Sequence, residues 1–135
     1  MAYFKKYILF IPVTLWLLII LILSGYPGKQ LPEIAVWQID KFVHTFIYGV
    51  LSLCLCFSFL KQFLDRKKRS SIAVKIIAFG IFYGGFMEIL QNNMFINRSG
   101  NWYDFFANAL GAILGVVIFP LLVKYLPLKK WFKRI

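Results

Sequence analysis

The sequence contains few of the residues that build disulfide frameworks or zinc sites, with one histidine and two cysteines among its 135 residues. Zinc sites usually recruit more His or Cys than this. Cys54 and Cys56 are two residues apart and point to different sides of a helix, so we expect packing residues rather than a disulfide or a redox pair. The chain also lacks the long apolar and polar alternation of barrel strands. These absences leave helices as the expected architecture.

Apolar residues are abundant, at 61% of the chain, whereas only 16% of the residues are charged. Soluble domains carry about a quarter charged residues, so the composition predicts a membrane protein. Four apolar runs approach the ~20 residues that a helix needs to cross a bilayer, at 7–23, 42–60, 72–90 and 105–124. The sequence therefore predicts an all-α membrane protein, a single domain over residues 1–135 with four transmembrane helices.

The first apolar run follows Lys5 and Lys6, a beginning that it shares with secretory signal peptides. The segment after it, SGYPGKQLPE, lacks the small-x-small pattern of a cleavage site. We therefore expect a retained helix.

The basic residues indicate an orientation for these helices. With both ends of the chain and the 61–75 connection on one side, only Lys29, Lys41 and Arg98 of the 16 basic residues fall on the other side. The positive-inside rule then predicts that both termini are cytoplasmic. Anionic lipid of the inner leaflet, rather than nucleic acid, is the expected partner of this charge. We expect the interfacial aromatic belt to include Trp37, Trp102 and Tyr103 outside and Trp131 inside.

The other polar residues gather at the predicted outer ends of the last three helices. They are Asp40, Lys41, His44 and Tyr48 in the second helix, Glu88 and Gln91 in the third, Asp104 and Asn108 in the fourth, and Arg98 between the last two. The four-residue steps from Asp40 through His44 to Tyr48 place these side chains on one stripe. The sequence therefore predicts a polar cluster where three helices meet.

Glycines continue two of these polar faces into the membrane. Gly80 and Gly84 share a face with Glu88, and Gly111 and Gly115 share a face with Asn108. This small-xxx-small spacing lets helix backbones approach closely in lipid. We expect the last three helices to pack through these faces, with the polar cluster at the outer end.

The charges of the cluster need partners at this depth. Asp40 and Asp104 can each be explained as an N-cap or a dipole partner at a helix start. Glu88 lies near a helix C-terminal end, where an acid opposes the dipole and needs a cation. The candidates for that cation are Arg98, Lys41 and a protonated His44.

The ordered set of these residues resembles the VanZ family of small bacterial membrane proteins. The first matching block is DKFVHTFIY and the second is EILQNNMFINRSGNWYDFFANALGAILG, and the resemblance extends over residues 24–115. The founding member is associated with resistance to teicoplanin-type glycopeptide antibiotics. The resemblance implies a multi-pass protein of the bacterial plasma membrane that acts at the cell envelope, and it implies no mechanism.

Several functions are compatible with the cluster. The first is binding of a lipid head group, a lipid-linked cell-wall precursor, a glycopeptide-related ligand or a partner protein in an outward-facing pocket, without turnover. Its expected binding residues are Lys41, Tyr48, Gln91, Arg98, Asp104 and Asn108. The second is catalysis, with His44 as general base or nucleophile, oriented by Asp40 or Glu88, and with Lys41 and Arg98 holding a phosphate or pyrophosphate.

Two further explanations stay open. Asp40, His44, Glu88, Asp104 and Asn108 offer ligands suited to Mg²⁺, Mn²⁺ or Ca²⁺, although the nearby cations oppose a metal and we expect no cofactor. Alternatively, the charges only lock three helices together. Transport is less attractive, since the chain has no internal repeat and no acid at mid-membrane depth.

Overall fold

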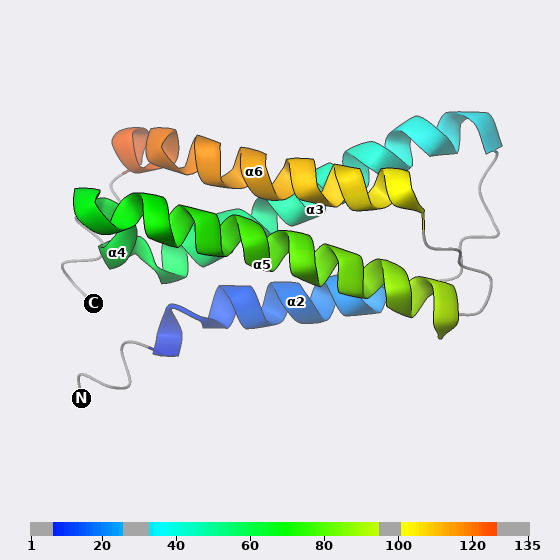
Figure 1. Ribbon diagram of the computed structural model, residues 1–135, viewed down its shortest axis with the longest axis horizontal. Helices are drawn as coiled ribbons and strands as arrows, with labels where there is room; N and C mark the ends of the chain where they lie inside the picture. Colours follow the sequence, from blue (N-terminus) through cyan, green and yellow to red (C-terminus); the bar gives the residue numbers. More distant parts are fainter. Residues whose placement is uncertain (1–6, 26–32, 95–100, 127–135) are drawn as a thin grey trace.

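The computed structural model describes residues 7–25, 33–94 and 101–126, and within these ranges the regular structure is helical (Figure 1). The helices are α2 (Ile11–Ser24), α3 (Glu33–Ser58), α4 (Leu60–Leu64), α5 (Arg66–Asn93) and α6 (Trp102–Tyr125). In α3 the side chains are described from Ile39 onward. The expected all-helical architecture is confirmed for the described residues.

Three of these helices are long and apolar enough to cross a membrane. They are Ile39–Ser58 within α3, Arg66–Asn93 and Trp102–Tyr125. The apolar α2 has 14 residues, which at 1.5 Å per residue is ~21 Å and shorter than the ~30 Å hydrocarbon core. The described residues therefore contain three candidate spans rather than the four expected.

Helices α3, α5 and α6 begin earlier than the apolar runs predict, whereas α2 begins later, at Ile11 instead of residue 7. Helix α3 begins at Glu33 instead of residue 42, and α5 begins at Arg66 instead of residue 72. At α5 the reason is a cap, because Asp65 accepts a hydrogen bond from the Lys67 amide at 3.0 Å and starts the helix within the charged segment. Hydropathy located the spans but not the polar helical turns before them.

These boundaries correct one explanation of the acids. Asp40 lies inside α3, seven residues after Glu33, so it is not a cap. The N-cap of α6 is Asn101, whose side chain accepts from the Tyr103 amide at 3.0 Å, so Asp104 is not the cap either. Asp104 does lie in the first turn of α6, where the helix dipole favours an acid.

Glycines set the distance between α3 and α6, which lie against each other along the bundle (Figure 1). A Cβ at Gly111 would lie 2.2 Å from the Thr45 carbonyl oxygen, and one at Gly115 would lie 2.4 Å from the Gly49 carbonyl oxygen. On α5, a Cβ at Gly80 would lie 2.7 Å from the Ala112 Cβ. The backbones therefore approach closely through the glycine faces, as the small-xxx-small spacing predicts.

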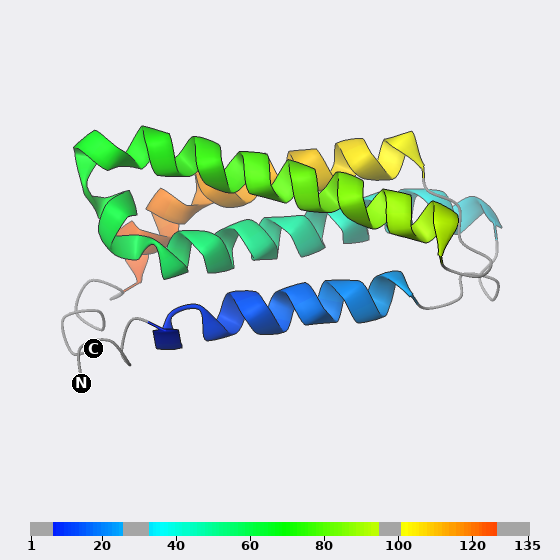
Figure 2. The ribbon, with the colours of Figure 1, turned by 60° about the horizontal axis from the view of Figure 1, so that its bottom comes forward.

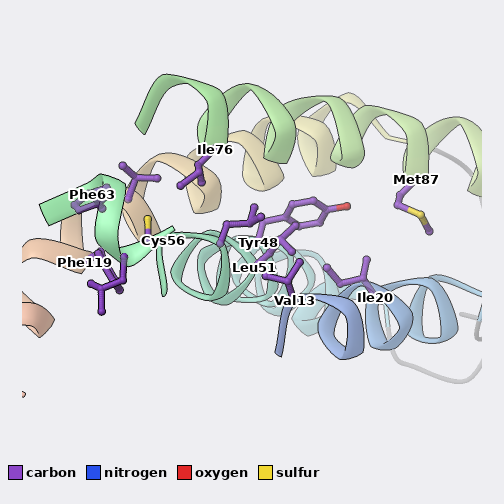
Figure 3. Packing of buried hydrophobic residues seen from close by; sticks show 12 residues of the cluster. Val13, Ile20, Tyr48, Leu51, Cys56, Phe63, Ile76, Met87 and Phe119 are labelled. Carbon is purple, nitrogen blue, oxygen red and sulfur yellow. The ribbon is translucent and has the colours of Figure 1, made fainter. Parts of the chain in front are cut away.

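Helix α2 runs along one side of the other helices (Figure 2) and is attached through side-chain hydrogen bonds. The Trp16 Nε1–H donates to the Ile47 carbonyl at 2.9 Å, and the Tyr83 hydroxyl donates to the Leu17 carbonyl at 3.0 Å. Val13 and Ile20 of α2 join the buried core (Figure 3). These contacts place α2 against α3 and α5, where it forms a wall of the candidate site.

The two ends of the bundle differ in chemistry. We call one the basic end, which carries α4 and the start of α5 with Lys61, Arg66, Lys67, Lys68 and Arg69. We call the other the polar end, where α2 and α5 finish, α6 begins, and Asp40, Glu88 and Asp104 lie (Figure 1). The candidate site is at the polar end.

Candidate functional site

An ion-pair cluster joins α3 to α6 at the polar end. The Lys41 Nζ lies 2.8 Å from Asp40 Oδ2 and also contacts Asp104 Oδ1. The Lys41 and Asp104 side chains are only 17% and 10% exposed. Removing either one would leave the other as a largely buried charge with a lost ion pair, which is destabilising. Lys41 therefore serves as the cation between two carboxylates on neighbouring helices.

A second chain of polar contacts runs from α3 through α6 to α5. His44 Nδ1 lies 2.9 Å from Asn108 Oδ1, and Asn108 Nδ2 donates to Glu88 Oε1 at 3.2 Å. The other Glu88 oxygen accepts from the Asn101 amide at 3.1 Å. Asn108 is 1% exposed, so its amide is fully committed to these two neighbours. The chain links the stripe of α3 to the buried acid of α5.

The direction of this chain assigns a tautomer to His44. Because the Asn108 amide nitrogen faces the Glu88 carboxylate, its oxygen faces the imidazole, and the Nδ1 atom must carry the hydrogen. The other ring nitrogen, Nε2, then holds the lone pair of the neutral ring. Nε2 lies 3.7 Å from Asp40 Oδ1, too far for a direct hydrogen bond. In this tautomer Nε2 is therefore a hydrogen-bond acceptor.

No cation is among the hydrogen-bond partners of Glu88 in the described residues, although the sequence led us to expect one. Within the described parts of the chain its recorded hydrogen bonds come from neutral donors, the Asn108 amide and the Asn101 backbone. Lys41 is held by Asp40 and Asp104 instead. His44, a second expected partner, reaches Glu88 through the Asn108 side chain. Arg98, the third, lies outside the described residues.

A cavity of about 230 Å³ opens beside these groups, between α2, α3, α5 and α6. Its polar lining comes from Asp40, His44, Tyr48, Glu88, Gln91, Asn108 and Ser24. Its apolar lining comes from Ile20, Leu23, Val43, Ile47 and Met87. The cavity thus pairs hydrogen-bonding groups with a hydrocarbon wall, an arrangement typical of small-molecule sites.

Tyr48 is one of the most buried polar side chains of this cavity. It is 2% exposed, and its hydroxyl has no hydrogen-bond partner within residues 7–25, 33–94 and 101–126. Figure 3 shows the hydroxyl directed along the bundle toward Met87, which also lines the cavity. A buried hydroxyl without a partner is costly, so this one points to a group that can occupy the cavity.

Glu88 also borders a second, more apolar cavity of about 470 Å³ between α5 and α6. The other lining residues are Gly85, Ile89, Asn92, Asn93, Asn101, Trp102 and Phe105. Asn93 and Asn101 are already engaged, in hydrogen bonds with the Ile89 carbonyl and the Tyr103 amide. Glu88 lines both cavities and lies between them.

The geometry restricts the metal hypothesis. Asp40, His44 and Asp104 each offer a ligand atom within 4.8 Å of the others, whereas Glu88 is not part of this group among the described residues. The Lys41 ammonium lies between the two aspartates, where a metal ion would have to bind. A divalent cation would therefore need to displace Lys41.

The structure brings together most of the residues that the sequence singled out. Asp40, Lys41, His44, Tyr48, Glu88, Gln91, Asp104 and Asn108 all lie at the cluster or line its cavity, and Arg98 lies outside the described residues. Sequence reasoning missed Asn101, although an Asn before a helical run is a recognisable N-cap. It also missed the wall supplied by α2, for which the sequence carried no signal.

Comparison with known proteins adds no family to this picture: no family model, no curated protein and no solved structure matches the chain.

Proposed function

We propose that this protein is a VanZ-like integral membrane protein of the bacterial cell envelope that binds a lipid head group or a lipid-linked cell-wall precursor. The proposal joins the motif resemblance in DKFVHTFIY and EILQNNMFINRSGNWYDFFANALGAILG to the cavity at the polar end. Through such binding it contributes to resistance to teicoplanin-type glycopeptides or to modification of the envelope.

The single observation that carries the proposal is the cavity lined by His44, Glu88 and the unpartnered Tyr48 hydroxyl on one side and by aliphatic side chains on the other. A bundle held together only by charge pairs has no need of a cavity beside them. A ligand with a polar head and a hydrocarbon portion matches both walls.

The proposed orientation places the polar end outside and the basic end in the cytoplasm of a multi-pass plasma-membrane protein. Support comes from the charges of the basic end, because Lys and Arg concentrate in cytoplasmic segments. The same residues would contact anionic lipid of the inner leaflet. In this arrangement α2 is a fourth membrane helix, accommodated by local thinning of the bilayer.

Catalysis is the second candidate, favoured by the geometry of His44. With Nδ1 oriented by Asn108, the Nε2 lone pair is available at the cavity, as a general base requires. Asp40 would stabilise the imidazolium that forms, since its carboxylate is 3.7 Å from Nε2. The substrate would be a phosphate- or pyrophosphate-linked lipid.

Mass spectrometry of lipids retained by the purified protein tests the proposal. We expect one lipid class to be enriched over the bulk membrane, and the enrichment to be lost in Glu88→Gln. A matched control is Asp65→Asn at the basic end, which should retain the same lipid. Equal lipid profiles for all three proteins would reject the binding function, and a chemically altered lipid that disappears in His44→Ala would favour the enzyme instead.

A further inference from the structure

The first observation concerns the charge balance of the site. Among the described residues, the polar end carries three carboxylates, those of Asp40, Glu88 and Asp104, and one lysine, Lys41. Lys41 pairs with Asp40 and Asp104, and no ion pair joins it to Glu88 among the described residues. Asp40 and Glu88 line the cavity, whereas Lys41 does not. The lining therefore presents hydrogen-bond acceptors and negative charge.

The second observation is the Tyr48 hydroxyl, which is independent of the acids. It is buried, lines the same cavity and has no partner in the described ranges (Figure 3). A hydroxyl oxygen accepts hydrogen bonds through its lone pairs. His44 Nε2 adds a further acceptor in the neutral tautomer assigned above. An occupant rich in N–H donors would satisfy all of these groups.

Helix ends add to the negative potential. Leu23 and Ser24 are the last residues of α2, and Gln91 lies in the last turn of α5, and all three line the cavity. The carboxyl end of a helix carries about half a negative charge. Two helix ends of the same sign therefore flank the cavity and favour a cation.

From these observations we propose that the group bound in this cavity is a primary ammonium attached to a carbon chain, as in an aminoalkyl lipid head group or a small free amine. The proposal rests on the proposed binding function and names its ligand class. An ammonium supplies three N–H donors to Asp40, Glu88 and Tyr48, and its carbon chain lies against Ile47 and Met87.

Two other ligand classes fit less well. A terminal phosphate is anionic at neutral pH and offers mainly hydrogen-bond acceptors. In this cavity it would face the carboxylates of Asp40 and Glu88, and the like charges would repel. A divalent metal requires convergent ligands, and at the group where ligand atoms converge, Asp40, His44 and Asp104, the Lys41 ammonium is already bound.

The test is a binding titration of the whole chain in detergent, measured by isothermal titration calorimetry. The probes are short-chain phosphatidylethanolamine, phosphatidylcholine and phosphatidylglycerol with identical acyl chains, then free ethanolamine, and Mg²⁺ alone. We expect phosphatidylethanolamine to bind at least tenfold more tightly than the other two lipids, because only its head group has a primary ammonium. Ethanolamine binding without the lipid would assign the free amine as the source.

Two variants connect this preference to the cavity. Tyr48→Phe removes no recorded hydrogen bond and should therefore fold, and we expect it to weaken phosphatidylethanolamine binding roughly tenfold. Glu88→Gln should weaken it further, since a charge is lost. The control is Tyr125→Phe, which removes an exposed hydroxyl at the far end of α6 and should change nothing.

The outcomes separate this inference from the function on which it rests. Tighter binding of phosphatidylglycerol, lost in Tyr48→Phe, would overturn the ammonium and leave the lipid-binding function standing. Binding of Mg²⁺ alone that is lost in Asp40→Asn would overturn it in favour of a metal. Binding of no probe, or binding that both cavity variants leave unchanged, would overturn the inference together with the cavity as a binding site.

Discussion

Replacement of Gly111 by alanine tests the packing that holds the polar end together. The added Cβ would lie 2.2 Å from the Thr45 carbonyl oxygen and 2.9 Å from the Thr45 carbonyl carbon. Both atoms belong to a backbone and cannot rotate away. Ordinary van der Waals contact begins at 3.4 Å, so α3 and α6 must separate by about 1.2 Å.

The expected cost follows from overpacking, which typically destabilises by 1–3 kcal/mol. With a rigid backbone on the other side of the contact, we expect about 3 kcal/mol, offset by up to ~1 kcal/mol from the better helix propensity of alanine. Gly111→Ala should therefore lower the free energy of unfolding by about 2 kcal/mol. The separation would also weaken the Lys41–Asp104 and His44–Asn108 contacts, which join the same two helices.

Gly49→Ala provides the matched control on the facing helix. A Cβ there would lie 3.6 Å from the Gly111 carbonyl oxygen, an ordinary contact, so only the gain in helix propensity remains. Reversible unfolding in mixed micelles, followed by tryptophan fluorescence, would measure both variants. If Gly111→Ala proves as stable as Gly49→Ala, the close approach of α3 and α6 is refuted.

The remaining predictions concern single polar contacts, each measured by the same unfolding titration. Asp104→Asn should lower the free energy of unfolding by about 2 kcal/mol, because Lys41 still pairs with Asp40. Lys41→Met should lower it more, because Asp40 and Asp104 both lose their cation. The reverse order would contradict the assigned pairs. Asn108→Leu should cost about 2–4 kcal/mol, since it deprives both His44 and Glu88 of a partner, and a neutral effect would argue against the chain. Tyr83→Phe should cost about 1 kcal/mol through its bond to the Leu17 carbonyl, and an unchanged midpoint would mean that α2 is held by other contacts.

The sequence was sufficient to predict which faces of the long helices are buried. Gly80, Gly84 and Glu88 recur at helical spacing, and all three are buried on one side of α5. The same holds for Asn108 and Gly111 on α6. This succeeded because a membrane helix conceals its polar and small residues against its neighbours, so periodicity alone identifies the face.

Pairing within the cluster could be predicted only in part. Opposite charges on neighbouring helices suggested that Asp40, Lys41 and His44 find partners on the other two helices, and Asp104 and Asn108 are two of them. The neutral partners of Glu88 were not predicted. One of them is the backbone amide of Asn101, and every residue except proline has such an amide, so the residue type gives no signal. Which carboxylate receives the lysine depends on side-chain reach and helix rotation, and the sequence specifies neither.

The position of α2 was the least predictable feature. Trp16 and Tyr83 are two of many aromatic residues, which make up 19% of the chain, and no sequence pattern distinguishes them from the others. In the structure the indole N–H of Trp16 and the hydroxyl of Tyr83 each donate a hydrogen bond to a backbone carbonyl of a neighbouring helix. Both side chains are largely apolar and carry one polar group. Trp102 and Tyr103 are exposed near the polar end, as a belt requires, whereas the side chain of Trp37 and residue Trp131 lie outside what the structure describes.

The central claim, an outward-facing cavity that holds a ligand, is tested most directly by thiol labelling at its lining. Ser24→Cys, in a background where Cys54 and Cys56 are replaced by alanine, places one thiol at the cavity, and Ser70→Cys places one at the basic end. On intact cells, a membrane-impermeant reagent should modify Ser24→Cys and not Ser70→Cys. In the purified protein, phosphatidylethanolamine should slow the reaction of Ser24→Cys alone. Modification of Ser70→Cys from outside, or no protection of Ser24→Cys by any head group, would contradict the account.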